Sequence, residues 1–154
     1  MHLYTRICAE NPNRPEQALK PSSALVCLEY NPKDSHVLFG GCYNGQVAYW
    51  DTRKGSQPVE TTPVEHSHRE PTYKVIWVSS KTGTETFSCS TDGMVLWWDT
   101  RKMGEPVEKM VLDPTKKQDE KHAEGATCLE YEPSIVRVFS NHYQIIHSIF
   151  VWTQ

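Results

Sequence analysis

The segment Glu65 to Pro71, Glu-His-Ser-His-Arg-Glu-Pro, holds the densest group of chemically active side chains in this sequence. Two histidines between acids could bind a metal ion or exchange protons with a substrate. In an extended strand the His-x-His spacing directs both imidazoles to one side, but zinc needs a third protein ligand, which the spacing does not supply. We therefore interpret His66 and His68 as structural residues, and we expect no metal site.

Other signatures of catalysis are missing. The sequence contains no G-x-S-x-G, no glycine-rich phosphate loop and no H-E-x-x-H. We expect a protein that is not an enzyme, with no catalytic residues and no cofactor.

Charge and hydropathy argue against three further classes of protein: nucleic-acid-binding, secreted and membrane-spanning proteins. There are 16 Lys and Arg against 19 Asp and Glu, a net charge of -3, which gives no electrostatic reason to expect nucleic acid or an anionic membrane as partner. The N-terminal stretch reaches charge and proline too early for a signal peptide, and no apolar run is long enough for a membrane span. We expect a soluble, cytoplasmic protein.

The cysteines suggest no cross-links. They are odd in number, widely spaced and without a C-x-x-C pair, which favours buried thiols in a reducing compartment over disulfides or a zinc knuckle. The five are Cys8, Cys27, Cys42, Cys89 and Cys128.

The elements around these residues repeat. Trp50-Asp51 recurs as Trp98-Asp99 and Asn44-Gly45 recurs as Asp92-Gly93, each 48 residues later. The stretch Val26 to Pro32 returns, slightly changed, at Thr127 to Pro133, 101 residues on. This period is typical of propeller blades, which are about 40–50 residues each.

Each unit has the pattern of a β-hairpin. Asn-Gly and Asp-Gly favour type I′ turns, and the flanking runs 36–42, 46–50, 84–90 and 94–98 are rich in β-branched and aromatic residues. Runs 24–30 and 73–78 predict a further strand per unit, and the polar segments with Pro58 and Pro106 predict an outer edge strand. Strands that are apolar on both faces predict stacked four-stranded antiparallel sheets, an all-β propeller fragment.

These residues resemble the WD-repeat β-propeller family. The resemblance implies a hydrogen-bonded cluster in the second unit that joins Asp92 and Trp98 to His66 or His68 and to Ser88 or Ser90. The first unit has Asn44 in place of the aspartate and no histidine between Pro21 and Ala24, which puts its cluster in doubt. The structural blade residues so implied are Asn44, Gly45, Trp50, Asp51, His68, Ser88, Asp92, Gly93, Trp98 and Asp99.

Residues 11 to 133 are further similar to the outer-arm axonemal dynein intermediate chain 2 family, through long stretches such as Asn11 to Ser56 and Ser79 to Glu108. The resemblance implies a non-catalytic scaffold subunit needed for outer-arm assembly and ciliary or flagellar motility. The implied partners are the dynein heavy chain, a second intermediate chain and light chains, with microtubules reached through the complex. The implied location is the cytoskeleton of the ciliary or flagellar axoneme.

The family pattern divides the chain into five segments. We expect the end of a preceding blade at 1–23, WD blades at 24–66 and 67–124, the first strand of a third blade at 125–134, and a divergent tail at 135–154. In the tail, Asn141 and Trp152 are 11 positions apart, against 6 for Asn44 and Trp50. We therefore expect a partial or truncated chain whose tail is an unpaired, aggregation-prone strand, with a partner-binding stretch as the alternative.

Two alternatives concern exposed segments. The Trp-Asp-Thr-Arg motifs resemble the box by which some propellers dock on cullin-type ubiquitin ligases as substrate receptors, which would make Arg53 and Arg101 interaction residues. The mixed-charge run 113–125 is interpreted as a solvated loop, with a docking segment as the alternative.

Overall fold

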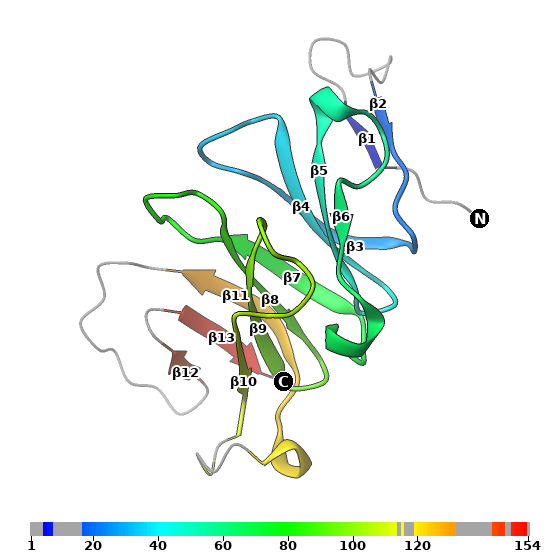
Figure 1. The fold of residues 1–154 in the computed structure, drawn as a ribbon. Helices are drawn as coiled ribbons and strands as arrows, with labels where there is room; N and C mark the ends of the chain where they lie inside the picture. The colour runs from blue at the N-terminus through cyan, green and yellow to red at the C-terminus, as the bar shows by residue number, and fades with distance from the viewer. Residues whose placement is uncertain are drawn as a thin grey trace.

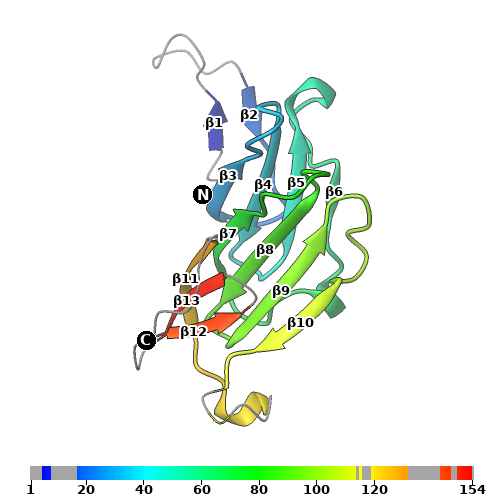
Figure 2. The same cartoon turned by 90° about the vertical axis from the view of Figure 1, so that its left-hand side faces the viewer.

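The strands of this chain form small antiparallel sheets stacked one behind another, as Figures 1 and 2 show. The computed structural model describes residues 5–7, 17–113, 115, 119–131, 143–146 and 149–153, with side chains over 17–113, 115 and 119–131. Within these residues there are strands and three 3-10 turns but no α-helix, and no helix has the length and apolar character that crossing a membrane requires.

Two of the sheets are complete four-stranded blades in which strand order follows chain order. This confirms the predicted all-β class. The first blade contains β3 (Leu25–Tyr30), β4 (Val37–Cys42), β5 (Val47–Asp51) and β6 (Glu60–Thr61). The second contains β7 (Thr72–Trp77), β8 (Glu85–Ser90), β9 (Met94–Asp99) and β10 (Glu108–Val111).

The strand registers of the two blades agree at the repeat distance. Leu38 lies opposite Trp50 in the first blade, and Thr86 lies opposite Trp98 in the second. The register places Gly40 of the first blade at the position that Ser88 has in the second. The hairpins are therefore equivalent position by position, although their side chains differ.

A shared apolar layer joins the two blades. Side chains alternate between the faces of a strand, so Val37 and Phe39 of β4 turn toward the second blade and pack with Val75 and Trp77 of β7. Phe39 and Trp77 meet edge to face, with ring centroids 5.8 Å apart. Such a pair contributes about 0.5–1.5 kcal/mol beyond its buried area.

Polar contacts close the same boundary. The buried Asn31 donates from Nδ2 to the carbonyl oxygen of Gly83, at 2.8 Å, and Lys74 Nζ lies 2.8 Å from Glu29 Oε1. The indole of Trp77 donates to the backbone oxygen of Glu29, at 3.3 Å. The first two strands of each blade are therefore tied to their neighbours by both apolar and polar contacts.

The outer faces of the two blades are also covered. Leu38, Ala48 and Trp50 are fully buried together with Leu19 of β2 (Gln17–Leu19), which pairs with β1 (Thr5–Ile7). On the other side, Ile76 and its neighbours pack against β11 (Ala126–Tyr131). The blades thus have the apolar cover on both faces that their composition predicts.

The third sheet corrects the expectation of an unpaired tail. β12 (Tyr143–Ile146) pairs with β13 (Ile149–Thr153), and β13 pairs directly with β11. Strand β11 offers an open edge, and the tail satisfies its backbone groups by joining that edge, in the order β11-β13-β12. The chain order of the complete blades is not repeated here.

The prolines of the outer segments also differ from the sequence prediction. Pro58 and Pro106 lie two residues before β6 and β10 instead of within them. Proline has no N–H to donate to a ladder, so the paired strand begins after it. The five-segment division of the chain stays a prediction.

Candidate functional site

A chain of buried polar groups runs through the second blade. His68 Nε2 lies 2.8 Å from Ser88 Oγ, and His68 Nδ1 lies 3.2 Å from Asp92 Oδ2. Trp98 donates from Nε1 to the same serine oxygen, at 2.9 Å. The structure thus selects the buried His68 over the exposed His66. It selects Ser88 over Ser90 because Ser88 is the serine that lies within hydrogen-bond distance of the imidazole.

Hydrogen bonds hold Asp92 in its ionised form. Burial alone would raise its pKa, but the hydrogen bond and charge of His68, with the amides of Arg69 and Met94, hold the pKa below the usual range. Those two backbone amides donate to the carboxylate at 3.0 Å each. Asp92 therefore fixes both the hairpin turn and the loop that carries His68.

The Ser88, His68 and Asp92 arrangement has the connectivity of a hydrolase triad, but its surroundings oppose that role. Ser88 and the His68 side chain are fully buried, so a substrate has no path to the hydroxyl. The indole of Trp98 donates to the oxygen that would have to attack. The arrangement therefore acts as a buried polar network that ties β8, β9 and the turn between them to the loop that carries His68.

The first blade lacks an equivalent network. Gly40 stands where Ser88 stands, and the indole nitrogen of Trp50 is buried with no hydrogen-bond partner among the residues that the structure describes. Asn44 is exposed and donates to Gln46 Oε1 at 2.7 Å instead of binding a histidine. The two blades therefore have the same strand register, but only in the second does the indole of the Trp-Asp tryptophan, Trp98, donate a hydrogen bond to a described residue.

This mismatch gives a paired prediction. Trp98→Phe is expected to destabilise the chain by about 1–3 kcal/mol more than Trp50→Phe. Both indoles are fully buried, so the volume lost is the same, but only Trp98 loses a hydrogen bond while Trp50→Phe removes an unsatisfied donor. Urea unfolding of the two variants measures the difference, and equal costs would show that the Ser88 contact contributes nothing.

The glycine turns connect neighbouring blades. The carbonyl oxygen of Gly45 accepts from the amide of His68, at 3.2 Å, and from the hydroxyl of Thr72, at 3.1 Å. Gly93 lies close to the next loop, where a Cβ on this glycine would come within 2.5 Å of Ala123 Cβ. No signal in one sequence pairs Gly45 with His68, because the contact depends on how the sheets stack.

The two Trp-Asp-Thr-Arg motifs fold back on themselves. Asp51 accepts from the side chain of Arg53 at 2.8 Å, and Asp99 accepts from Arg101 Nε at 3.0 Å. The side-chain hydrogen bond from each arginine holds the pKa of its aspartate below the usual range. Arg53 also pairs with Asp34, at 2.8 Å. The motifs organise the turn after the third strand, and this does not favour the ligase alternative.

The thiols correct part of the sequence expectation. Cys42 and Cys89 are buried, but Cys27 is partly exposed and Cys128 is exposed, while Cys8 lies outside the described residues. Burial raises the pKa of Cys27 and of Cys42 to about 11, so both are protonated at neutral pH. All four described thiols are free.

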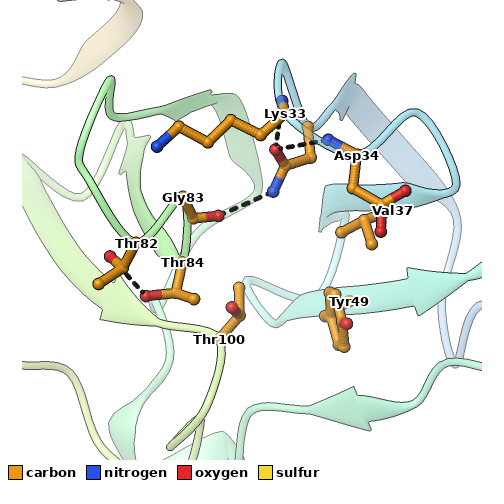
Figure 3. A pocket seen from close by; sticks show the side chains of 9 residues that line it. Lys33, Asp34, Val37, Tyr49, Thr82, Gly83, Thr84 and Thr100 are labelled. Atoms are coloured by element: carbon orange, nitrogen blue, oxygen red, sulfur yellow. Dashed lines mark hydrogen bonds between the residues drawn. The ribbon is translucent and has the colours of Figure 1, made fainter.

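A hollow of about 210 Å³ opens between the two blades, beside the Asn31 contact with Gly83 (Figure 3). Its only carboxylate belongs to Asp34, which Arg53 neutralises, and Lys33 Nζ is bound to the carbonyl oxygens of Ser80 and Lys81. Both charged groups of the lining are therefore already engaged by other groups of the protein. Its lining is Asn31, Lys33, Asp34, Val37, Tyr49, Thr82, Gly83, Thr84 and Thr100.

The described residues of the run 113–125 are mostly exposed and make ion pairs at the surface. Its described part contains the 3-10 turn η3 (Glu120–His122), and Glu120 pairs with Lys109 of β10 at 2.8 Å and with Arg69 at 3.1 Å. Across the part of the chain that the structure describes, no group of three or more His, Cys, Asp or Glu side chains is placed to hold a metal ion.

Comparison with known proteins finds dynein intermediate chains. The model of the "Dynein axonemal intermediate chain 3 WD40 domain" family matches residues 7–86. The chain is 69% identical over 130 residues to "Dynein intermediate chain 3, ciliary" of Heliocidaris crassispina, covering 84% of this chain and 22% of that one. It is 67% identical over 130 residues to "Dynein axonemal intermediate chain 2" of Xenopus laevis, with the same coverage.

A more distant relative is similar over nearly the same share of the chain. "Dynein, 70 kDa intermediate chain, flagellar outer arm" of Chlamydomonas reinhardtii is 51% identical over 122 residues, 79% of this chain and 21% of that one. The chain therefore spans about a fifth of the length of the curated relatives it matches.

Proposed function

Since the chain belongs to the axonemal dynein intermediate chain family, in its WD40 domain, we propose that it is a non-catalytic scaffold of the outer dynein arm. In this role it binds the dynein heavy chain and a second intermediate chain, and it supports arm assembly and ciliary or flagellar motility. Its location is the axoneme, and ATP hydrolysis belongs to the heavy chain.

The single observation that carries this proposal is the 69% identity to a ciliary dynein intermediate chain over 84% of the sequence. The geometry agrees with a scaffold. The most reactive group of side chains, around His68, is sealed inside a blade, where it stabilises structure and cannot meet a substrate. Stacked blades leave their rims and loops free for protein contacts.

Affinity purification tests the proposal. The tagged chain, expressed in ciliated cells and recovered at near-physiological salt, is expected to bring down dynein heavy chain and the second intermediate chain, identified by mass spectrometry. A full-length relative serves as the positive control. Recovery of chaperones alone, with the full-length control intact, would show that these blades do not make the native contacts.

A matched pair of variants separates folding from binding. Asp92→Ala disrupts the buried network of the second blade and is expected to lose the dynein subunits. Lys54→Ala changes an exposed side chain beyond the third strand and is expected to keep them. If both variants recover the same subunits as the unchanged chain, the blade fold has no part in the interaction.

A further inference from the structure

The outer segments of both blades share one tripeptide. Pro-Val-Glu occurs at 58–60, at 63–65 and at 106–108. Each proline restricts the local backbone, and each valine that follows is exposed: Val59 by 39%, Val64 by 68% and Val107 by 58%. Single exposed apolar residues are common on protein surfaces, but here the same exposed pair of valine and glutamate recurs three times.

These segments gather along one rim. β6 and β10 are the outermost strands of their blades, each paired on one side only within the described residues. In both views the loop 100–107 lies beside β6 and the 3-10 turn η2 (Val64–His66) that follows it (Figures 1 and 2). His66 is close enough to Glu105 to contribute to lowering its pKa. The rim therefore runs continuously from one blade to the next.

The rim also keeps an open backbone edge. Val107 donates its amide inward to the carbonyl oxygen of Trp97, at 2.7 Å. Leu112 donates its amide to the carbonyl oxygen of Gly93, at 2.8 Å, in the same register that pairs Glu108 with Trp97. Because backbone groups of successive strand residues point to opposite sides, those of Lys109 and Val111 face away from the sheet. An open edge of this kind can accept another strand.

Unpaired acids surround the valines. Glu60, Glu65 and Glu108 are exposed, and none of them takes part in an ion pair among the described residues. The nearest basic side chains of β10 and its loop are already engaged, Lys109 by Glu120 and Lys102 by Glu105. The free charge on this rim is therefore negative.

We propose that this rim binds an extended segment of a partner protein in which Lys or Arg alternates with apolar residues. The segment adds to the edge of β10 by backbone hydrogen bonds, its apolar side chains contact the three valines, and its cations meet the three glutamates. Alternation suits this surface because side chains of an added strand point to two sides in turn. The inference goes beyond membership of a dynein arm and does not depend on it.

Binding of short peptides tests this surface directly. The probe is a fluorescent peptide of alternating Lys and Val, with alternating Glu and Val and alternating Lys and Ser peptides as controls, and anisotropy is measured with the purified chain. The Lys and Val peptide is expected to bind at least tenfold more tightly than either control. Raising the salt from 0.05 to 0.5 M is expected to weaken it several-fold, because exposed charge pairs are screened.

Variants locate the site. Val59→Ser, Val64→Ser and Val107→Ser together are expected to lower affinity at least tenfold, and Glu60→Gln, Glu65→Gln and Glu108→Gln together are expected to remove most of the salt dependence. Val26→Ser, at an exposed valine of the innermost strand β3, is the matched control and is expected to bind normally. Circular dichroism confirms that each variant is folded.

Three outcomes would overturn the inference. The first is equal binding of the acidic peptide, and the second is unchanged binding by the triple variants. The third is self-association of the chain that the valine variants abolish, because the occupant of the rim would then be a second copy and not a basic segment.

Discussion

Replacing Gly45 with alanine is expected to destabilise the chain by about 2–6 kcal/mol, from left-handed backbone strain and overpacking together. Gly45 has a φ of 83°, and a Cβ at this position would lie 2.0 Å from the carbonyl oxygen of His68. That oxygen belongs to the backbone, so it cannot move away as a flexible side chain would. The substitution must open the contact between the first hairpin and the loop of the second blade.

Two other glycines separate the causes. Gly55 has a φ of 114° but no atom near its would-be Cβ, so Gly55→Ala adds backbone strain alone, about 1–3 kcal/mol. Gly104 has neither feature, so Gly104→Ala is expected to be nearly neutral. Denaturant unfolding ranks the three variants. If Gly45→Ala costs no more than Gly55→Ala, the close approach to His68 is not rigid.

Removing the Asp92 carboxylate is expected to cost about 3–5 kcal/mol at neutral pH, the usual effect of breaking a buried ionic contact. Asp92→Ala leaves three donors without an acceptor: His68 Nδ1 and the amides of Arg69 and Met94. Protection of the β8 and β9 amides from hydrogen exchange should fall with it. Retained protection in this blade together with an unchanged unfolding midpoint would contradict the assigned role.

Asp92→Asn is the matched variant because the first blade has Asn44 at the equivalent position. The amide keeps one acceptor oxygen but turns a donor toward groups that also donate, so we expect an intermediate cost of about 1–3 kcal/mol. The free energy of unfolding is expected to be lowest for Asp92→Ala, intermediate for Asp92→Asn and highest for the unchanged chain. If Asp92→Asn and the unchanged chain unfold with the same free energy, the charge of the carboxylate has no effect on stability.

Acid should remove the advantage of Asp92 over asparagine. The pKa of Asp92 is lower in the folded chain than its ordinary value of 3.8, so the carboxylate stabilises the fold fully above that value. The contribution is lost as the pH falls through the lowered pKa. Unfolding of the chain and of Asp92→Asn is compared at pH 7, 5 and 3. The gap should hold between pH 7 and 5 and shrink at pH 3, and a gap that widens in acid would reverse the assigned sign.

Local features of the fold could be predicted from the sequence. The 48-residue period, the Asn44-Gly45 and Asp92-Gly93 turns, and the strands beside them are encoded within short stretches, because a hairpin is specified by its turn residues and by β-propensity close by. The apolar composition of β9 likewise predicted neighbours on both faces. The resemblance to WD-repeat propellers further implies that the buried network contains Asp92 and Trp98, one of two histidines and one of two serines.

Tertiary structure decided which of those residues meet. Stacking of the sheets brings His68 to Ser88. The pairing of β13 with β11 likewise joins distant segments. None of these contacts is local in the chain. They depend on the alignment of whole strands and sheets, whose energy is spread over many side chains, so the residues at any one position do not determine them.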